Sequence, residues 1–90
     1  MKNRSKLEIM AQILDIASGG GTSKTKIMYK AYLSYAQLRE YLTILIENGL
    51  IGHDEENAAF KITQKGIRFM GIYKQMDSLS GTMMAKLLPS

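Results

Sequence analysis

The clearest hydrophobic pattern in this chain lies between Ser34 and Gly49. Its apolar positions recur at i, i+3, i+4, i+7 and i+8, which is typical of a helix with one buried stripe: Leu38, Tyr41, Leu42, Leu45 and Ile46. Ser34 is followed three residues later by Gln37, so the two side chains can form a reciprocal capping box. Gly49 indicates the carboxyl end of the helix. The segment therefore predicts one complete helix with a polar outer face.

Two further helices are predicted before it. A wide apolar stripe indicates a first helix from about Ser5 to Ser18, and the glycines at 19–21 end it. Thr22 or Ser23 can cap a short second helix with lysines on its polar side. A short helix, a tight turn and a longer helix together predict a helix-turn-helix.

The rest of the chain predicts a hairpin and a long last helix. Strand-like runs at 50–54 and 58–63 flank an acidic tip. Thr63 can cap a helix from about Gln64 to Leu88. We therefore expect a mainly α fold with a small β-hairpin, a winged helix, in which residues 1–66 form the domain and 67–90 an extension.

The last helix also carries a coiled-coil pattern. Apolar residues spaced 3, 4, 3 and 4 follow the a/d repeat, and a further leucine continues the same side: Phe69, Ile72, Met76, Leu79, Met83 and Leu87. Ile67 and Met70, on a neighbouring face, are expected to cover the domain's own core. The repeat predicts a homodimer. The alternative is that residues 78–90, rich in weak helix formers, form no stable helix.

Charge is distributed unevenly along the chain. The net charge is +4 overall, with +4 in residues 1–40, −4 in 41–57 and +4 from 58 onward. A polyanion would therefore meet the first half and the last third of the chain more favourably than the middle. A solvated surface of mixed charge is the alternative interpretation.

Few signs of other chemistry are present. The chain has no cysteine and one histidine, so neither a disulfide framework nor a Cys or His metal cluster is predicted. His53, beside two acidic residues, is interpreted as part of a solvated turn. The glycine-rich segment 19–25 lacks the spacing of a phosphate-binding loop. We expect neither an enzyme nor a cofactor, no membrane span, and a cytoplasmic, nucleoid-associated location.

Three segments carry a family resemblance: SKLEIMAQILDIAS at 5–18, KTKIMYKAYLSYAQL at 24–38 and ITQKG at 62–66. They resemble the small archaeal winged-helix DNA-binding proteins of about ten kilodaltons, known from Sulfolobus and grouped with predicted transcriptional regulators. The resemblance implies a winged helix whose last helix pairs with that of a second subunit as an antiparallel coiled coil. It also implies DNA binding. The hairpin tip is acidic, which departs from the family pattern and does not favour a strong phosphate contact by the hairpin.

The third helix is the candidate for the major groove of double-stranded DNA. Gln37 suits adenine and Arg39 suits guanine, whereas Tyr35 can reach a base or a phosphate. Lysines would position the duplex backbone, including those of the amino terminus, where Arg4 lies between Lys2 and Lys6. The predicted DNA-binding residues are Lys24, Lys26, Lys30, Ser34, Tyr35, Ala36, Gln37, Arg39 and Thr43.

Three functions remain open at this stage. A transcriptional regulator would read a short site, and an architectural chromatin protein would cover DNA with little sequence preference. A winged helix that binds only protein is the third, and the acidic hairpin favours it. We rank them in that order.

Overall fold

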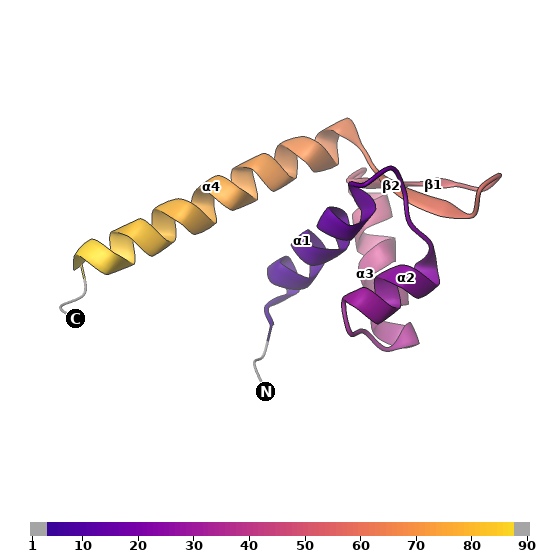
Figure 1. The fold of residues 1–90 in the computed structure, drawn as a ribbon, viewed down its shortest axis with the longest axis horizontal. Helices are drawn as coiled ribbons and strands as arrows, with labels where there is room; N and C mark the ends of the chain where they lie inside the picture. Colours follow the sequence, from indigo (N-terminus) through magenta and orange to yellow (C-terminus); the bar gives the residue numbers. More distant parts are fainter. Residues whose placement is uncertain (1–3, 88–90) are drawn as a thin grey trace.

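The computed structural model describes residues 4–87, and the side chains of residues 4–76. The elements follow the predicted order (Figure 1): α1 (Lys6–Ala17), α2 (Lys24–Lys30), α3 (Tyr35–Glu47), β1 (Ile51–Asp54), β2 (Ala59–Ile62) and α4 (Gln64–Leu87). α1, α2 and α3 gather beside the hairpin, while α4 leads away from it. The sequence-based prediction of a mainly helical fold with one antiparallel hairpin is confirmed.

Side-chain caps begin the first three helices. The hydroxyl oxygen of Ser5 accepts from the Glu8 amide, and the Glu8 carboxylate accepts in return from the Ser5 amide. Ser23, rather than Thr22, caps α2 by accepting from the Lys26 amide. These bonds satisfy amides that a helix start leaves without an intrahelical partner.

Gly49 ends α3 in the manner expected from the sequence. Its φ of 70° lies in the left-handed region, where a residue without Cβ is favoured. The Leu50 amide donates to the Leu45 carbonyl at 2.9 Å, and the Gly49 amide donates to the Ile46 carbonyl at 3.0 Å. This pair of bonds is a Schellman motif, and it turns the chain from α3 into β1.

The hairpin is tied to the helical part by a β-bridge. β1 and β2 pair antiparallel with Ile51 opposite Ile62 and His53 opposite Phe60. Thr22, just before α2, then pairs with Phe60 on the other edge of β2. The Thr22 amide donates to the Phe60 carbonyl at 2.9 Å and the Phe60 amide donates to the Thr22 carbonyl at 2.7 Å. The connection between α1 and α2 thus acts as a third strand.

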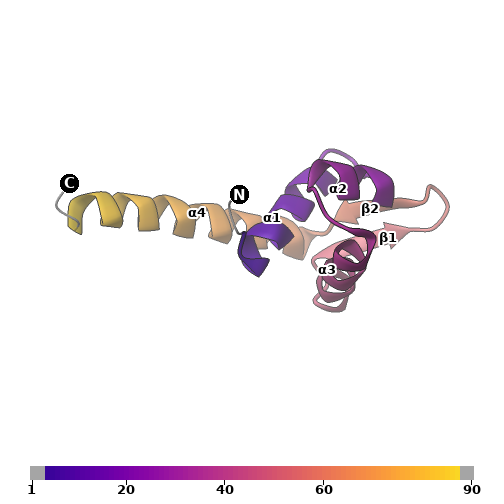
Figure 2. The same ribbon diagram turned by 90° about the horizontal axis from the view of Figure 1, so that it is seen from below.

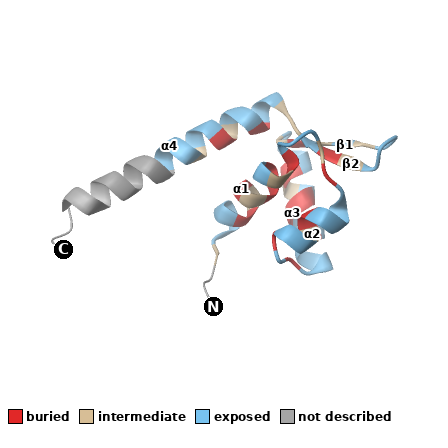
Figure 3. Cartoon of the chain, in the orientation of Figure 1, coloured by how far each residue is buried: buried red, intermediate tan, exposed pale blue. Residues whose placement is uncertain are grey.

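The core lies between α1, α2, α3 and the hairpin (Figure 3). Its fully buried large side chains are Ile13, Leu14, Ile27, Leu38, Leu45 and Ile51. Met70 joins it from α4, as predicted. Two predictions of burial are wrong: Ile46 is 44% exposed and Ile67 is 53% exposed. Ile46 faces the space between α3 and the hairpin, and Ile67 lines an open hollow beside Ile62 and Met70.

α4 is anchored by its first turn. The Thr63 hydroxyl donates to the Gly49 carbonyl at 2.6 Å and accepts from the Gly66 amide at 3.0 Å, so Thr63 caps α4, as predicted, and joins it to the end of α3. Gly66 packs directly on the chain after α3: a Cβ there would collide with the Leu50 carbonyl oxygen and lie 2.6 Å from Ile62 Cγ1. Only glycine fits this approach.

Beyond this junction α4 projects past the other elements in both views (Figures 1 and 2). Phe69 and Tyr73 are partly buried against the core and stack on each other, with ring centroids 6.5 Å apart. Ile72 and Met76 are exposed. Of the predicted coiled-coil positions, Leu79, Met83 and Leu87 lie outside the described side chains. In the part of the chain that the structure describes, no helix is long and apolar enough to cross a membrane.

Gly66→Ala should lower the free energy of unfolding by roughly 1 to 3 kcal/mol, because the added Cβ overpacks the junction between α4 and Leu50. Gly71→Ala is the matched control on the same helix, since a Cβ there meets nothing within 4 Å. It should raise stability by roughly 0.5 to 1 kcal/mol through helix propensity. Thermal unfolding of both variants measures the difference, and equal effects would contradict the close approach.

Candidate nucleic-acid interface

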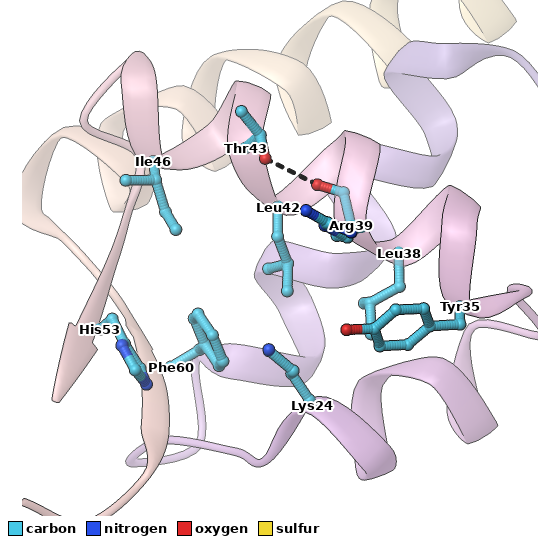
Figure 4. A pocket seen from close by; sticks show the side chains of 9 residues that line it. All are labelled: Lys24, Tyr35, Leu38, Arg39, Leu42, Thr43, Ile46, His53 and Phe60. Atoms are coloured by element: carbon cyan, nitrogen blue, oxygen red, sulfur yellow. Dashed lines mark hydrogen bonds between the residues drawn. The ribbon is translucent and has the colours of Figure 1, made fainter. Parts of the chain in front are cut away.

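One side of α3 faces the hairpin across a cavity. Tyr35, Arg39, Thr43 and Ile46 are spaced 4, 4 and 3 residues apart, so they share one side of the helix. Figure 4 shows Lys24 of α2 and His53 of β1 reaching the same space from other elements. The cavity measures about 240 Å³ and is lined by Lys24, Tyr35, Leu38, Arg39, Leu42, Thr43, Ile46, His53 and Phe60.

The cavity has an apolar floor and a basic rim. Leu38, Leu42 and Phe60 are buried, whereas the lysine, arginine and tyrosine at the rim are exposed. No carboxylate belongs to the lining. At 100° per residue, Glu40 and Glu47 lie farther from the cavity side of the helix than Arg39 and Ile46 do. This side of α3 is therefore positive, although the helix as a whole carries more acidic than basic residues.

His53 lies in β1, within the strand-like run predicted at 50–54, and its side chain is exposed, as expected of a solvated position. Its ring also stacks on Phe60, with centroids 4.4 Å apart and an interplanar angle of 17°, a contact that the prediction did not include. The alternation of a strand that begins at Ile51 places His53 on the same face as Ile51, opposite Phe60. That alternation was the available signal for its place at the cavity.

The capping box at the start of α3 engages one of the predicted base-reading side chains. The Gln37 carbonyl oxygen accepts from the Ser34 amide at 3.0 Å, and the Ser34 hydroxyl accepts from the Gln37 amide at 3.2 Å. Thr43 also has a local partner, because its hydroxyl donates to the Arg39 carbonyl at 2.8 Å. Among the described residues, no hydrogen bond engages the Arg39 guanidinium or the Tyr35 hydroxyl.

The predicted DNA-binding residues are all exposed, but they do not form one group. Lys24, Tyr35, Arg39 and Thr43 meet at the cavity. Lys26 lies beside the glycine-rich loop and β2, and Lys30 lies near the exposed rings of Tyr29 and Tyr32. Ser34 and Gln37 form the cap, and Ala36 is exposed on the outer face of α3.

Arg4 was expected along a bound duplex, and the structure gives it a different partner. Its guanidinium Nη1 donates to the Ala31 carbonyl at 2.6 Å and to Gln12 Oε1 at 2.7 Å. Ala31 is the C-cap of α2, where carbonyl oxygens without helical partners attract a cation. Arg4 therefore braces the turn between α2 and α3. Lys6 is exposed, and Lys2 lies outside the described residues.

The tip of the hairpin is acidic and locally ordered. The Asp54 carboxylate accepts from the Asn57 side-chain amide at 2.8 Å and from the Glu56 backbone amide at 3.1 Å, with Lys61 Nζ at 3.6 Å. The hydrogen bond from the Asn57 side chain and, to a lesser extent, the Asn57 backbone amide and the Lys61 ammonium lower the pKa of Asp54. Within the described residues, no three histidine, cysteine, aspartate or glutamate side chains gather as a metal site.

Three helices, of which the second and third form a helix-turn-helix, and a hairpin that packs beside the third helix define a winged helix-turn-helix protein. The chain belongs to the winged helix-turn-helix family, whose model matches residues 3–81. It is 34% identical over 78 residues to an uncharacterized protein of Methanocaldococcus jannaschii, covering 86% of this chain and 78% of that protein.

A solved structure is similar over almost the whole chain. This is the crystal structure of Sso10a-2, a DNA-binding protein from Sulfolobus solfataricus, with a TM-score of 0.63 and 25% sequence identity. The match covers 97% of this chain and 100% of that one. The resemblance to small archaeal winged-helix proteins of about ten kilodaltons is thereby confirmed.

Asn57→Ala should raise the pKa of Asp54 toward its ordinary value, because it removes the largest cause of the lowering. A lowered folded-state pKa contributes stability above the unfolded pKa that is lost as pH falls through the folded value, so the variant should lose less stability on acidification. An NMR titration of the Asp54 carboxyl measures this. Asn48→Ala, at the distant end of α3, is the control and should leave the Asp54 pKa unchanged.

Proposed function

We propose that this protein is a dimeric winged-helix DNA-binding protein that regulates transcription, with α3 in the major groove of a duplex. The observation that carries the proposal is the meeting of Lys24, Tyr35 and Arg39 on one side of the helix-turn-helix, with no carboxylate in the lining of the cavity between them. A surface of one charge sign attracts a polyanion and directs its approach. Its place would be the cytoplasm, at the nucleoid.

The exposed polar residues of this surface suit two different kinds of DNA contact, to bases and to phosphates. Arg39 carries donors that fit guanine O6 and N7, so it is the base reader of the proposal. Lys24 and Lys26 sit in the first turn of α2 and suit phosphates, as does the Tyr35 hydroxyl at the start of α3. The acidic tip at Asp54–Glu56 does not suit phosphate. The hairpin therefore contributes to the interface through its strands rather than through its tip.

The relatives support the same conclusion. Sso10a-2 is named as a DNA-binding protein, and its structure matches this chain from the helix-turn-helix through the long last helix. Because the similarity spans nearly the whole of both chains, it concerns the arrangement of the domain and α4 together. A related architecture that binds DNA favours the same activity here.

The dimer of the proposal is held by α4. The helix has 24 residues, about 36 Å at 1.5 Å per residue. Among its described side chains, Phe69, Met70 and Tyr73 pack on the domain. Ile72 and Met76 are exposed on the next turns and continue the 3, 4 spacing that begins at Phe69. An antiparallel pairing with a second α4 would bury this side and would include the predicted positions Leu79, Met83 and Leu87.

An architectural chromatin role is the second candidate, and Gln37 favours it. An adenine contact by glutamine uses the carbonyl oxygen and the amide group together. Because that oxygen already caps α3, fewer side chains remain to read bases. A protein with one arginine reader would bind many sequences with similar affinity.

Replacing Lys24 and Lys26 by alanine should weaken binding to all duplexes alike and lower the slope of log K against log salt by about 0.9 per lost contact. Arg39→Ala should instead change the ranking of a site library and cost roughly 1 to 3 kcal/mol at one base position if it makes a bidentate contact. Lys74→Ala, on α4, is the matched lysine control.

The library measurement separates the candidates. Uniform loss of affinity in the Arg39 variant favours the architectural role over the regulatory one. If neither the lysine pair nor Arg39 affects affinity, this surface is not the DNA interface, and binding of a protein partner becomes the better explanation.

Ile72→Asp combined with Met76→Asp should convert the protein from a dimer to a monomer, because a buried interface would hold uncompensated charges. Sedimentation should report a mass near 10.1 kDa for the variant and twice that for the unmodified protein. Gln75→Asp adds a charge to the same exposed turn and should leave the dimer intact. An unmodified protein that sediments as a monomer at micromolar concentration would contradict the dimer.

A further inference from the structure

The cavity between α3 and the hairpin has the composition of a ligand site as well as of a DNA surface. Its floor consists of side chains that cannot form hydrogen bonds, Leu38, Leu42 and Phe60, and each is at least nine-tenths buried. Figure 4 shows the Tyr35 hydroxyl and the Lys24 ammonium pointing into the space from two different helices. An apolar hollow with a few converging polar groups is typical of a small-molecule site.

The volume limits what can enter. At about 240 Å³ the cavity is smaller than the roughly 300 to 1,000 Å³ of sites for drug-sized ligands. It has the volume of about eight water molecules, taking roughly 30 Å³ for each. A single ring or a short branched chain fits, and a nucleotide does not.

The charges of the lining limit the chemistry. Lys24 and Arg39 are cations, His53 adds an imidazole, and the lining has no carboxylate to balance them. An anionic head group would be complementary to this rim and would accept hydrogen bonds from it. A neutral apolar molecule would fill the floor but would leave the cations without a partner.

We propose that this cavity binds a small carboxylate with a compact apolar body, and that the bound carboxylate and DNA exclude each other. The apolar body lies against Phe60, Leu42 and Ile46, and the carboxylate lies toward Lys24 and Arg39. The exclusion rests on the proposed function, because it assigns Lys24, Tyr35 and Arg39 to the duplex. The binding of the carboxylate does not depend on it.

The test uses 3-phenylpropionate as the probe and the full-length protein. In a titration followed by the backbone amide resonances, the probe should produce saturable shifts around Leu42, Ile46 and Phe60 at millimolar concentration. Propionate lacks the apolar body and 3-phenylpropan-1-ol lacks the charge. Each should bind at least tenfold more weakly at the same ionic strength.

A pair of tryptophan variants locates the site. Ile46→Trp should fill the cavity and abolish the shifts, and Ile46 is exposed enough that the change does not enter the core. Glu47→Trp places the same bulk on the neighbouring side of α3 and should leave probe binding unchanged. Thermal unfolding of both variants verifies that they are folded.

The second arm measures displacement of a labelled duplex by the probe. Release of DNA over the same concentration range that saturates the amide shifts, with propionate inactive, supports the exclusion. Simultaneous binding of probe and duplex overturns the exclusion, and absence of saturable shifts, or equal binding by Ile46→Trp, overturns the site. If no duplex binds even without the probe, the proposed function fails while the titration still decides the carboxylate site.

Discussion

The pair of backbone hydrogen bonds between Thr22 and Phe60 determines how the hairpin and the helix-turn-helix face each other. Thr22 is followed directly by the Ser23 cap and by Lys24, so the bridge fixes the start of α2 relative to β2. On β2, Phe60 forms the cavity floor and carries the stacked ring of His53. Together with the packing of Ile27 and Phe60 in the common core, the bridge sets the separation between the lysine of one element and the aromatic rings of the other. It thereby helps to place Lys24, His53 and Phe60, which line the cavity of the candidate interface.

The same side chains stabilise the fold and occupy its interface, and this limits what they can recognise. Gln37 stands in the first turn of α3, where a base-reading residue would be expected, yet its oxygen completes the helix cap. Arg39 has no such structural partner among the described residues. The distinction between positions that hold the helix and positions available to a ligand therefore falls within a single turn of α3.

Features that depend on neighbours in sequence were predictable. The caps at Ser23, Ser34 and Thr63 and the helix end at Gly49 follow from spacing of a few residues, and the structure has each of them. The helix-turn-helix and the hairpin followed from the same local patterns. Residue types near the start of α2 and on α3 also indicated a basic surface.

The errors concern contacts between distant parts of the chain. Ile46 fits the apolar spacing of α3, but whether that edge is covered depends on where the hairpin lies. His53 was interpreted only as a solvated position, because its stacking on Phe60 depends on how the two strands pair. Arg4 looked like a phosphate ligand, since nothing nearby in sequence shows that a carbonyl 27 positions later would accept a hydrogen bond from its guanidinium. Tertiary packing decides such cases.

The hydrogen bonds of Arg4 couple the residues before α1 to the turn between α2 and α3. The turn between α2 and α3 includes Tyr32 in a left-handed conformation with φ of 54°, which costs energy for a residue other than glycine. Arg4 bonds the carbonyl oxygen just before it. The residues around Arg4 and the two helices of the helix-turn-helix therefore belong to one cooperative unit. Loss of the Arg4 hydrogen bonds would lower the free energy needed to open the turn locally. Because a chain is synthesised from its amino end, Arg4 is made before the turn whose carbonyl oxygen it bonds.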